Sequence, residues 1–313
     1  MNVAAVGAAA ASVSLMAACA LPLPERVTVA SLDTGASGDP VRVAALLYRP
    51  AGFAPAGGFP AVIVLHGCGG LYGALRGPAD ELSRHYAGWT RDLVGEGYAV
   101  LFPDSFNPRG QREVCTTRPE ARTINPRRRR LDALGALAWL AAQDGIDRER
   151  IALLGFSHGG STTLATINAR DRAVAAFRAV PDAPPFFRAA VAYYPGCRPF
   201  AAAGESWRPA VPTRIYIGEK DDWTPAAPCA ALAAAQQARG EPLEVIVYAD
   251  SYHGFDGPAR RLYVRSNVPG GVNPGQGVTI GPNPEAGADA RTKTRAFLRE
   301  RLAPTGVMCA TAD

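Results

Sequence analysis

Short apolar runs recur along this chain and alternate with longer segments in which apolar residues return every three or four positions. A continuous apolar run of about 4–8 residues is typical of a strand buried on both faces of a parallel sheet. The wider spacing predicts a helix with one buried face. This alternation predicts an α/β fold with a mostly parallel, doubly wound sheet flanked by helices.

The expected strands cover residues 26–30, 42–48, 61–65, 98–102, 151–155, 189–194, 213–217 and 243–248, and the run 61–65 is apolar throughout. The expected helices cover residues 80–95, 129–142, 161–168, 229–239 and 289–302; residues 161–168 are small and compatible with a helix. The chain shows no internal repeat and no second domain boundary. We therefore expect one α/β domain over residues 25–303 and a C-terminal tail over residues 304–313.

Three of the connections between these elements are long. Residues 103–128 are rich in Pro and Arg, and a compact domain tolerates such length mainly where the segment contributes to a site. Residues 171–188 are either a lid over the substrate or a plain surface crossover. Residues 257–284, rich in Gly, Pro and Asn, are expected to be coil.

The N-terminal residues 1–19 differ from the rest of the chain. Residues 3–18 carry no charge and form an apolar run too short to span a membrane, which is typical of a signal peptide. The run ends in Leu-Met-Ala-Ala-Cys, so Cys19 is a candidate for lipidation, although ordinary signal-peptide cleavage also fits. We expect an exported protein, either periplasmic or anchored to the membrane through Cys19.

Export changes the interpretation of the six cysteines, because disulfides form in oxidising compartments. Cys197 follows a strand end and Cys229 begins a helix near the same edge of the sheet. We hypothesise that these two form a disulfide that braces the loop between them. The other pairings stay open, because spacing alone does not fix connectivity.

The composition is globular, with 48% hydrophobic and 19% charged residues, and the net charge is +5. Much of the positive excess lies in Arg122 and the run Arg127–Arg130. We expect this run to be a solvated loop and helix start. No aromatic interleaving or nucleic-acid motif accompanies it, so no nucleic-acid partner is expected.

The candidate chemistry begins at Gly155-Phe-Ser-His-Gly159, directly after the apolar run 151–155. Strand, tight turn with Ser at its tip, and helix form the nucleophile elbow of the α/β-hydrolase fold. The nucleophile would be Ser157. A glycine-rich turn with a bystander serine is the alternative until partner residues are found.

A serine hydroxyl needs a general base, and the chain has four histidines. His85 lies within an expected helix as a partly exposed surface residue, His66 precedes a glycine loop, and His158 is fixed beside the nucleophile. His253 lies on the loop after a late strand, where catalytic groups gather in open α/β sheets. We therefore assign His253 as the base.

The base needs an orienting carboxylate, and Asp221 and Asp222 follow the preceding strand. Either gives the chain order Ser, Asp, His that α/β-hydrolases use. His66-Gly-Cys-Gly-Gly70 resembles the oxyanion loop after their third strand. The expected oxyanion donors are therefore the backbone N–H groups of Cys68 and His158.

The sequence contains no motif for a cofactor or a metal. There is no Gly-x-Gly-x-x-Gly after a strand and no phosphate-binding Gly-Lys-Ser/Thr loop. There is also no Cys-x-x-Cys, and no two histidines stand at helical ligand spacing. We expect neither a cofactor nor a metal site.

Five stretches together resemble the dienelactone hydrolase family of α/β-hydrolases. They are Leu65-His-Gly-Cys-Gly-Gly70, Pro103-Asp-Ser-Phe106, Gly-Phe-Ser-His-Gly-Gly, Gly-Glu-Lys-Asp-Asp-Trp-Thr-Pro and Tyr-His-Gly-Phe-Asp, spread over about residues 30–302. The resemblance implies a monomeric, cofactor-free hydrolase of small-molecule esters or lactones. Dienelactone hydrolases proper carry Cys in Gly-x-Cys-x-Gly, whereas this chain has Ser157, which favours a broader carboxylesterase.

The family pattern Gly-x-x-Asp-x-x-x-Pro also implies which aspartate serves the triad. Counted from Gly218 and Pro225, the acid is Asp221, and Asp222 is expected to be exposed or to hold the loop.

Two other functions fit the same fold. One is a peptidase of the prolyl-oligopeptidase type, although residues 20–60 are too few for its propeller domain. The other is a non-catalytic cell-surface scaffold, which would have no need of all three triad residues.

Overall fold

The structure, a computed structural model, describes residues 22–35, 37–73 and 81–304. The expected signal peptide with Cys19, and all of the expected tail except Pro304, lie outside the described residues. Export and lipidation therefore stay predictions.

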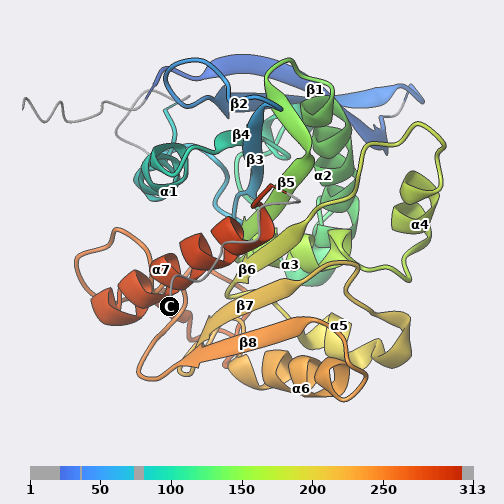
Figure 1. The fold of residues 1–313 in the computed structure, drawn as a ribbon. Coiled ribbons are helices and arrows are strands. Elements are labelled where there is room, and N and C mark those ends of the chain that lie inside the picture. The colour runs from blue at the N-terminus through green and yellow to red at the C-terminus, as the bar shows by residue number, and fades with distance from the viewer. Residues whose placement is uncertain (1–21, 36, 74–80, 305–313) are drawn as a thin grey trace, which may run out of the picture.

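The core is an eight-stranded sheet with the order β1-β2-β4-β3-β5-β6-β7-β8, shown in Figure 1. From β4 to β8 the neighbouring strands run parallel, whereas β1 and β2 are antiparallel and close one edge. The strands are β1 (Glu25–Thr34), β2 (Pro40–Tyr48), β3 (Phe59–Leu65), β4 (Ala99–Pro103), β5 (Ile146–Phe156), β6 (Ala189–Tyr193), β7 (Thr213–Gly218) and β8 (Leu243–Tyr248). The predicted mostly parallel sheet is confirmed.

Helices cover both faces of the sheet (Figure 1). On one face α1 (Arg84–Gly95) and α7 (Pro284–Arg301) lie together, joined by an ion pair between Asp92 and Arg291. The other face carries α2 (Pro126–Ala141), α3 (His158–Thr166) and α6 (Ala226–Gln237). The short helices α4 (Arg172–Arg178) and α5 (Arg198–Ala202) lie in connections on this side. Both faces of the central strands are therefore buried, which explains their continuous apolar runs.

Four helices begin a few residues before their expected starts, and α3 does so directly after the turn at Ser157. Asn125 and Asn283 cap α2 and α7 with their side chains, and a proline occupies the first turn of each helix. Pro225 precedes α6. Asparagine at the cap and proline at the first helical position are favourable starts, although neither continues an apolar pattern.

Each of the three long connections contains short regular elements within irregular chain. Residues 103–125 include two 3₁₀ turns, η1 (Asn107–Arg109) and η2 (Pro119–Ala121), and η3 (Gly204–Ser206) follows α5. Residues 171–188 include α4. The expectation of coil over residues 257–284 was wrong in part, because β9 (Tyr263–Arg265) and β10 (Val278–Ile280) pair there as an antiparallel hairpin.

Candidate active site

Ser157 lies at the sharp turn between β5 and α3. Its φ of 53° and ψ of −115° form a backbone conformation that residues other than glycine rarely adopt. The flanking glycines are needed for contact reasons. A Cβ on Gly155 would lie 2.2 Å from the Gly159 carbonyl oxygen, and one on Gly159 would lie 2.0 Å from the Leu65 carbonyl oxygen. The turn is thus possible only with glycine at both positions.

Ser157, His253 and Asp221 meet at the C-terminal edge of the sheet, on the loops after β5, β8 and β7. The His253 Nε2 atom lies 2.9 Å from the Ser157 Oγ, and its Nδ1 atom lies 2.8 Å from the Asp221 Oδ2. The Asp221 side chain is fully buried, and 5% of the His253 side chain is exposed. This geometry suits a nucleophile, a general base and a carboxylate that orients the base.

The two neighbouring aspartates have different partners. Asp221 accepts the backbone N–H groups of Trp223 and Thr224 at its Oδ1, at 2.9 and 2.7 Å, which leaves Oδ2 for His253. Asp222 turns away and accepts the backbone N–H and the hydroxyl of Thr279, both at 2.8 Å. Asp222 therefore ties the loop to β10 and does not reach the histidine.

Aromatic side chains hold His253 from both sides. The Tyr194 ring centroid lies 4.6 Å from the imidazole and that of Trp223 lies 4.8 Å from it. The Tyr194 hydroxyl donates to the buried Asp256 at 2.9 Å, and Asp256 also accepts the Trp89 indole N–H at 2.9 Å. Burial and Asp256 raise the pKa of Tyr194 well above its ordinary value, so the hydroxyl stays a donor.

Tyr194, Thr224 and Asp256 were not among the predicted site residues. Asp256 is the last residue of the motif Tyr-His-Gly-Phe-Asp, but nothing in the motif indicated a role for it. Thr224 directly follows the aspartate loop, and its hydroxyl lies 3.0 Å from Asp221 Oδ2 and 3.1 Å from His253 Nδ1. The sequence could have indicated Thr224, because it is a polar residue on a loop that was already assigned to the site.

The two expected oxyanion donors come from adjacent loops. Cys68 follows β3 and His158 begins α3, and both line the same cavity as Ser157. Cys68 forms a disulfide with Cys115, and its carbonyl accepts the Val114 N–H at 2.8 Å. The oxyanion loop is therefore fastened to residues 103–125, the connection that was expected to contribute to the site.

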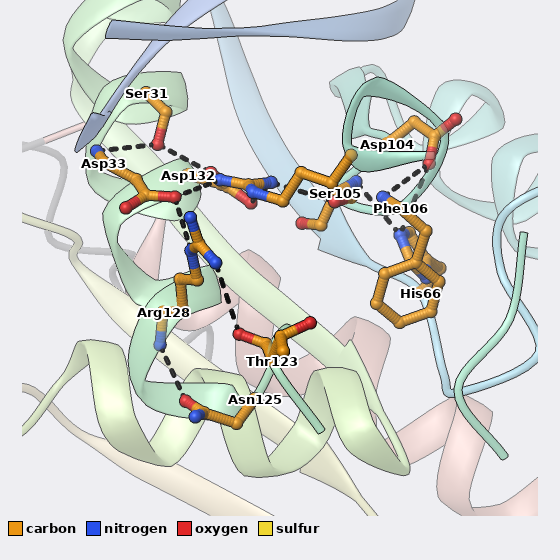
Figure 2. A network of polar contacts seen from close by, with 11 residues as sticks. Ser31, Asp33, His66, Asp104, Ser105, Phe106, Thr123, Asn125, Arg128 and Asp132 are labelled. Carbon is orange, nitrogen blue, oxygen red and sulfur yellow. Dashed lines mark hydrogen bonds and ion pairs between the residues drawn. The ribbon is translucent and has the colours of Figure 1, made fainter. Parts of the chain in front are cut away.

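Residues 103–125 are themselves held by a polar network, part of which is shown in Figure 2. Arg109 donates to both carboxylate oxygens of Asp132, at 2.7 and 3.0 Å, and to Asp33 at 2.8 Å. Asp104 caps the turn by accepting the backbone N–H of Phe106 at 3.0 Å (Figure 2). This segment therefore forms a fixed wall of the site.

The run Arg127–Arg130 is not the solvated face that was expected. Arg127 alone is exposed. Arg128 donates to Asp33 at 2.7 Å (Figure 2), and Arg130 pairs with Asp171 at 3.1 Å. Arg129 is completely buried beneath the oxyanion loop. The expectation was wrong because these partners lie far away in the sequence.

Three histidines outside the proposed triad have lowered pKa values, namely His66, His85 and His158. Burial lowers all three pKa values, and the Arg129 charge lowers those of His66 and His158 further. His66 and His158 are buried. His85 is half-buried, with 15% of its side chain exposed, as expected for a partly exposed residue. We call these three the neutral histidines.

A cavity of about 840 Å³ opens beside Ser157 and runs along one face of α3. Ser157, Ser161, Ala165 and Asn168 line its floor at helical spacing, which gives a length of about 16 Å. The lining includes apolar side chains and Asp171. It also includes five arginines, namely Arg122, Arg127, Arg130, Arg170 and Arg172. The cavity can hold a substrate considerably larger than acetate esters.

A match to the dienelactone hydrolase family extends over residues 43–302, which is most of the chain. The chain belongs to this family. Membership confirms the resemblance found in the motifs and places the chain among the carboxylic ester hydrolases. No curated protein matches the sequence.

Solved structures of low sequence identity share the fold. A protein from Klebsiella pneumoniae assigned to the dienelactone hydrolases is 18% identical, with a TM-score of 0.61 over 89% of this chain and 100% of that one. Thermogutta terrifontis esterase 2, phosphorylated by paraoxon, is 17% identical, with a TM-score of 0.57 over 91% and 97% of the two chains. A thermostable carboxylesterase cloned from a metagenomic library is 20% identical, with a TM-score of 0.57 over 91% and 92%.

Two disulfides in this family member flank the site. Cys197 is joined to Cys229, the hypothesised pair, and Cys68 is joined to Cys115, a pair that the spacing did not indicate. Among the described residues no cluster of three or more metal-ligating side chains occurs. None of the helices in the described part of the chain is both long and apolar enough to cross a membrane.

Proposed function

We propose that this protein is a serine hydrolase that cleaves carboxylic esters or lactones through an acyl-enzyme, with Ser157, His253 and Asp221 as its triad. The observation that carries the proposal is the continuous hydrogen-bonded arrangement from Ser157 Oγ to His253 and on to Asp221, at 2.9 and 2.8 Å. Three separate loops supply these side chains, so an accidental arrangement is a poor explanation.

In the proposed reaction His253 Nε2 takes the proton of Ser157 Oγ while that oxygen attacks the ester carbonyl carbon. The carbonyl oxygen becomes an anion, which the backbone N–H groups of Cys68 and His158 stabilise. The C–O bond to the alcohol breaks and His253 returns its proton to the leaving oxygen. Water, deprotonated by His253, then attacks the acyl-enzyme and releases the acid and free Ser157.

A fluorophosphonate probe tests the proposal directly. Such a probe phosphonylates an activated serine, and Thermogutta terrifontis esterase 2, which has the same fold, is phosphorylated by paraoxon. We expect one label per chain, on Ser157, and none in Ser157→Ala. A correctly folded protein that takes no label would support the non-catalytic scaffold instead. Labelling with cleavage of peptides but not esters would support the peptidase.

The arginines that line the cavity support a preference for negatively charged esters. Because Arg127 and Arg172 line the cavity and are exposed to its solvent, they attract an acid or alcohol portion that carries a negative charge. We expect the mono-p-nitrophenyl ester of glutaric acid to give a higher kcat/KM than p-nitrophenyl pentanoate. The ratio should fall with added salt and in the Arg127→Gln/Arg172→Gln double variant. An unchanged ratio would rule out the preference for negatively charged esters, but not the proposed ester hydrolysis.

We further propose that the protein acts as an exported monomer without a cofactor, with Cys19 lipidated or removed with the signal peptide. The uncharged run in residues 3–18 supports export, and the site requires no group beyond its own side chains.

A further inference from the structure

Arg129 is a buried cation whose hydrogen-bond partners are both neutral. Its side chain is completely buried in the first turn of α2. Its Nη1 donates to the His66 carbonyl oxygen and to His158 Nδ1, each at 2.8 Å. Its Nε and Nη2 atoms have no hydrogen-bond partner among the described residues. Burial lowers its pKa to about 10, so the guanidinium remains charged at neutral pH.

This position is unfavourable for stability alone. Burying a charge without a paired carboxylate is costly, and the N-terminus of a helix repels a cation. The neighbouring Arg109 shows the alternative, because Asp132 and Asp33 neutralise it. The charges of Asp132 and Asp104 act on Arg129, but its hydrogen bonds go to His66 and His158 and not to a carboxylate. A buried cation of this kind beside the candidate site is therefore a feature that function can explain.

The two bonds of Arg129 join the two halves of the proposed oxyanion hole. His66 stands two residues before Cys68 on the loop after β3. His158 carries the other donor N–H at the start of α3. We propose that Arg129 is a positioning residue of this oxyanion hole, which keeps both loops in register and supplies a fixed positive charge behind them. The inference rests on the proposed serine-hydrolase function.

Phe106 keeps this arrangement in place. The Arg129 guanidinium lies 5.0 Å from the Phe106 ring centroid, and the same ring lies 4.6 Å from the His66 imidazole and 5.9 Å from that of His158. Figure 2 shows Phe106 beside His66. His66 is fixed in turn, because its Nδ1–H donates to the Gly67 carbonyl at 2.9 Å and its Nε2 accepts the Ser105 N–H at 3.2 Å.

The bond from Arg129 also sets the state of His158. A guanidinium only donates, so His158 Nδ1 must accept and the ring proton must stand on Nε2. Burial, and after it the Arg129 charge, lowers the pKa of His158 well below the ordinary value and keeps the ring neutral. The residue that follows the nucleophile is therefore held in one orientation.

Negative charge appears on the substrate carbonyl oxygen only in the transition state. A positioned positive charge should therefore raise kcat and leave KM nearly unchanged. Removing a direct oxyanion donor typically lowers kcat by about 10²–10³-fold. Because Arg129 acts through other residues, we expect a smaller loss of about 10–100-fold. The affinity for a tetrahedral boronate anion should fall by the same factor.

Three substitutions separate charge from packing. Arg129→Lys keeps the charge and donors, Arg129→Gln keeps a donor without charge, and Arg129→Met keeps neither. Arg150→Met is the control. Arg150 also donates to two backbone carbonyls, those of Gly58 and Leu302, but it pairs with Asp147 at 2.6 Å and lies about 23 Å along β5 from Ser157.

The experiment measures kcat and KM for p-nitrophenyl butyrate, the Kd of butylboronic acid and Tm for each purified variant. Arg129→Lys should retain at least a third of kcat. Arg129→Gln and Arg129→Met should lose kcat and boronate affinity in parallel, with KM changed less than about threefold. Arg150→Met should lower Tm and leave both catalytic quantities unchanged.

Two results would overturn the inference. One is an Arg129→Met protein that loses Tm but keeps kcat and boronate affinity. The second result applies if Arg129→Met does not fold. In that case equal kcat values for Arg129→Lys and Arg129→Gln would overturn the inference. Failure of the proposed function looks different, because wild-type protein would then neither hydrolyse the ester nor take a fluorophosphonate label.

Discussion

The roles of Asp221 and Asp222 can be tested by the same small change at two adjacent positions. Replacing either aspartate with asparagine keeps the size of the side chain and exchanges one oxygen for an NH₂ group. In Asp221→Asn the remaining oxygen can still accept the N–H groups of Trp223 and Thr224. The NH₂ group then takes the place of Oδ2, which lies 2.8 Å from His253 Nδ1 in the wild-type protein.

An NH₂ group at that position is a donor, so it favours the tautomer in which Nδ1 accepts and the proton stands on Nε2. A protonated Nε2 cannot take the proton of Ser157. The same change in a serine protease triad lowers kcat by about 10⁴-fold. That factor corresponds to about 5.5 kcal/mol of transition-state stabilisation. We expect a loss of this size for Asp221→Asn with little change in KM.

Asp222→Asn alters a different contact. Asp222 accepts two bonds from Thr279 on β10, and an asparagine oxygen can keep one of them. The expected costs are about 1 kcal/mol of stability and less than about a tenfold loss of kcat, because the loop is only loosened.

The assay compares kcat and KM of both variants on p-nitrophenyl butyrate, with Ser157→Ala as the floor and urea denaturation to verify folding. A folded Asp222→Asn protein at the floor, beside an active Asp221→Asn protein, would refute the assignment. Equal losses in both variants would refute the idea that only one carboxylate serves His253.

Three further predictions concern stability and export. The neutral histidines have pKa values below the ordinary 6.5, so unfolding takes up protons below that pH. Their contribution to the free energy of unfolding is complete above pH 6.5 and falls as the pH drops, by up to about 1.4 kcal/mol per pH unit for each histidine. A urea midpoint that does not change between pH 7 and 5.5 would contradict this. Cys115→Ala opens a disulfide across 47 residues and should lower stability by about 4 kcal/mol, with a lower kcat because Cys68 is freed; denaturation and kinetics measure both effects. Cells that make the full chain should hold it outside the cytoplasm, and a cytosolic product that retains Met1 would overturn export.

Much of the fold, and the meeting of the candidate site residues, could be predicted because parallel strands end at one edge of the sheet. Apolar runs mark the central strands, and the residue types that follow the strands show what that edge can contain. Ser157, an aspartate pair and His253 follow three such runs in the sequence. Neighbouring strands then bring these loops together whatever the distance along the chain.

The residues alone left two aspartates open, and only the family pattern chose between them. Adjacent loop residues point in different directions, and their directions depend on the hydrogen bonds of the loop. Asp221 reaches His253 because the N–H groups of Trp223 and Thr224 hold its other oxygen. Asp222 finds Thr279 on a hairpin that was expected to be coil.

The run Arg127–Arg130 was the clearest failure of local pattern. Four consecutive arginines predict solvent exposure, yet Arg128 reaches Asp33, 95 residues away, and Arg129 reaches His66, 63 residues away. Charge pairs and buried donors of this kind depend on which distant segments lie beside the helix. The same holds for Cys68 and Cys115, since spacing does not limit which thiols can meet.

The sequence by itself determined the order of the main strands and helices, the elbow at Ser157 and the residue types at the sheet edge. These depend on local periodicity and on glycines that a tight turn requires. The tertiary structure decided which carboxylate contacts His253, which arginine contacts the loop after β3 and which cysteines are joined. Each of those depends on directional contacts of about 3 Å between residues far apart in the chain, and only the packed fold sets such distances.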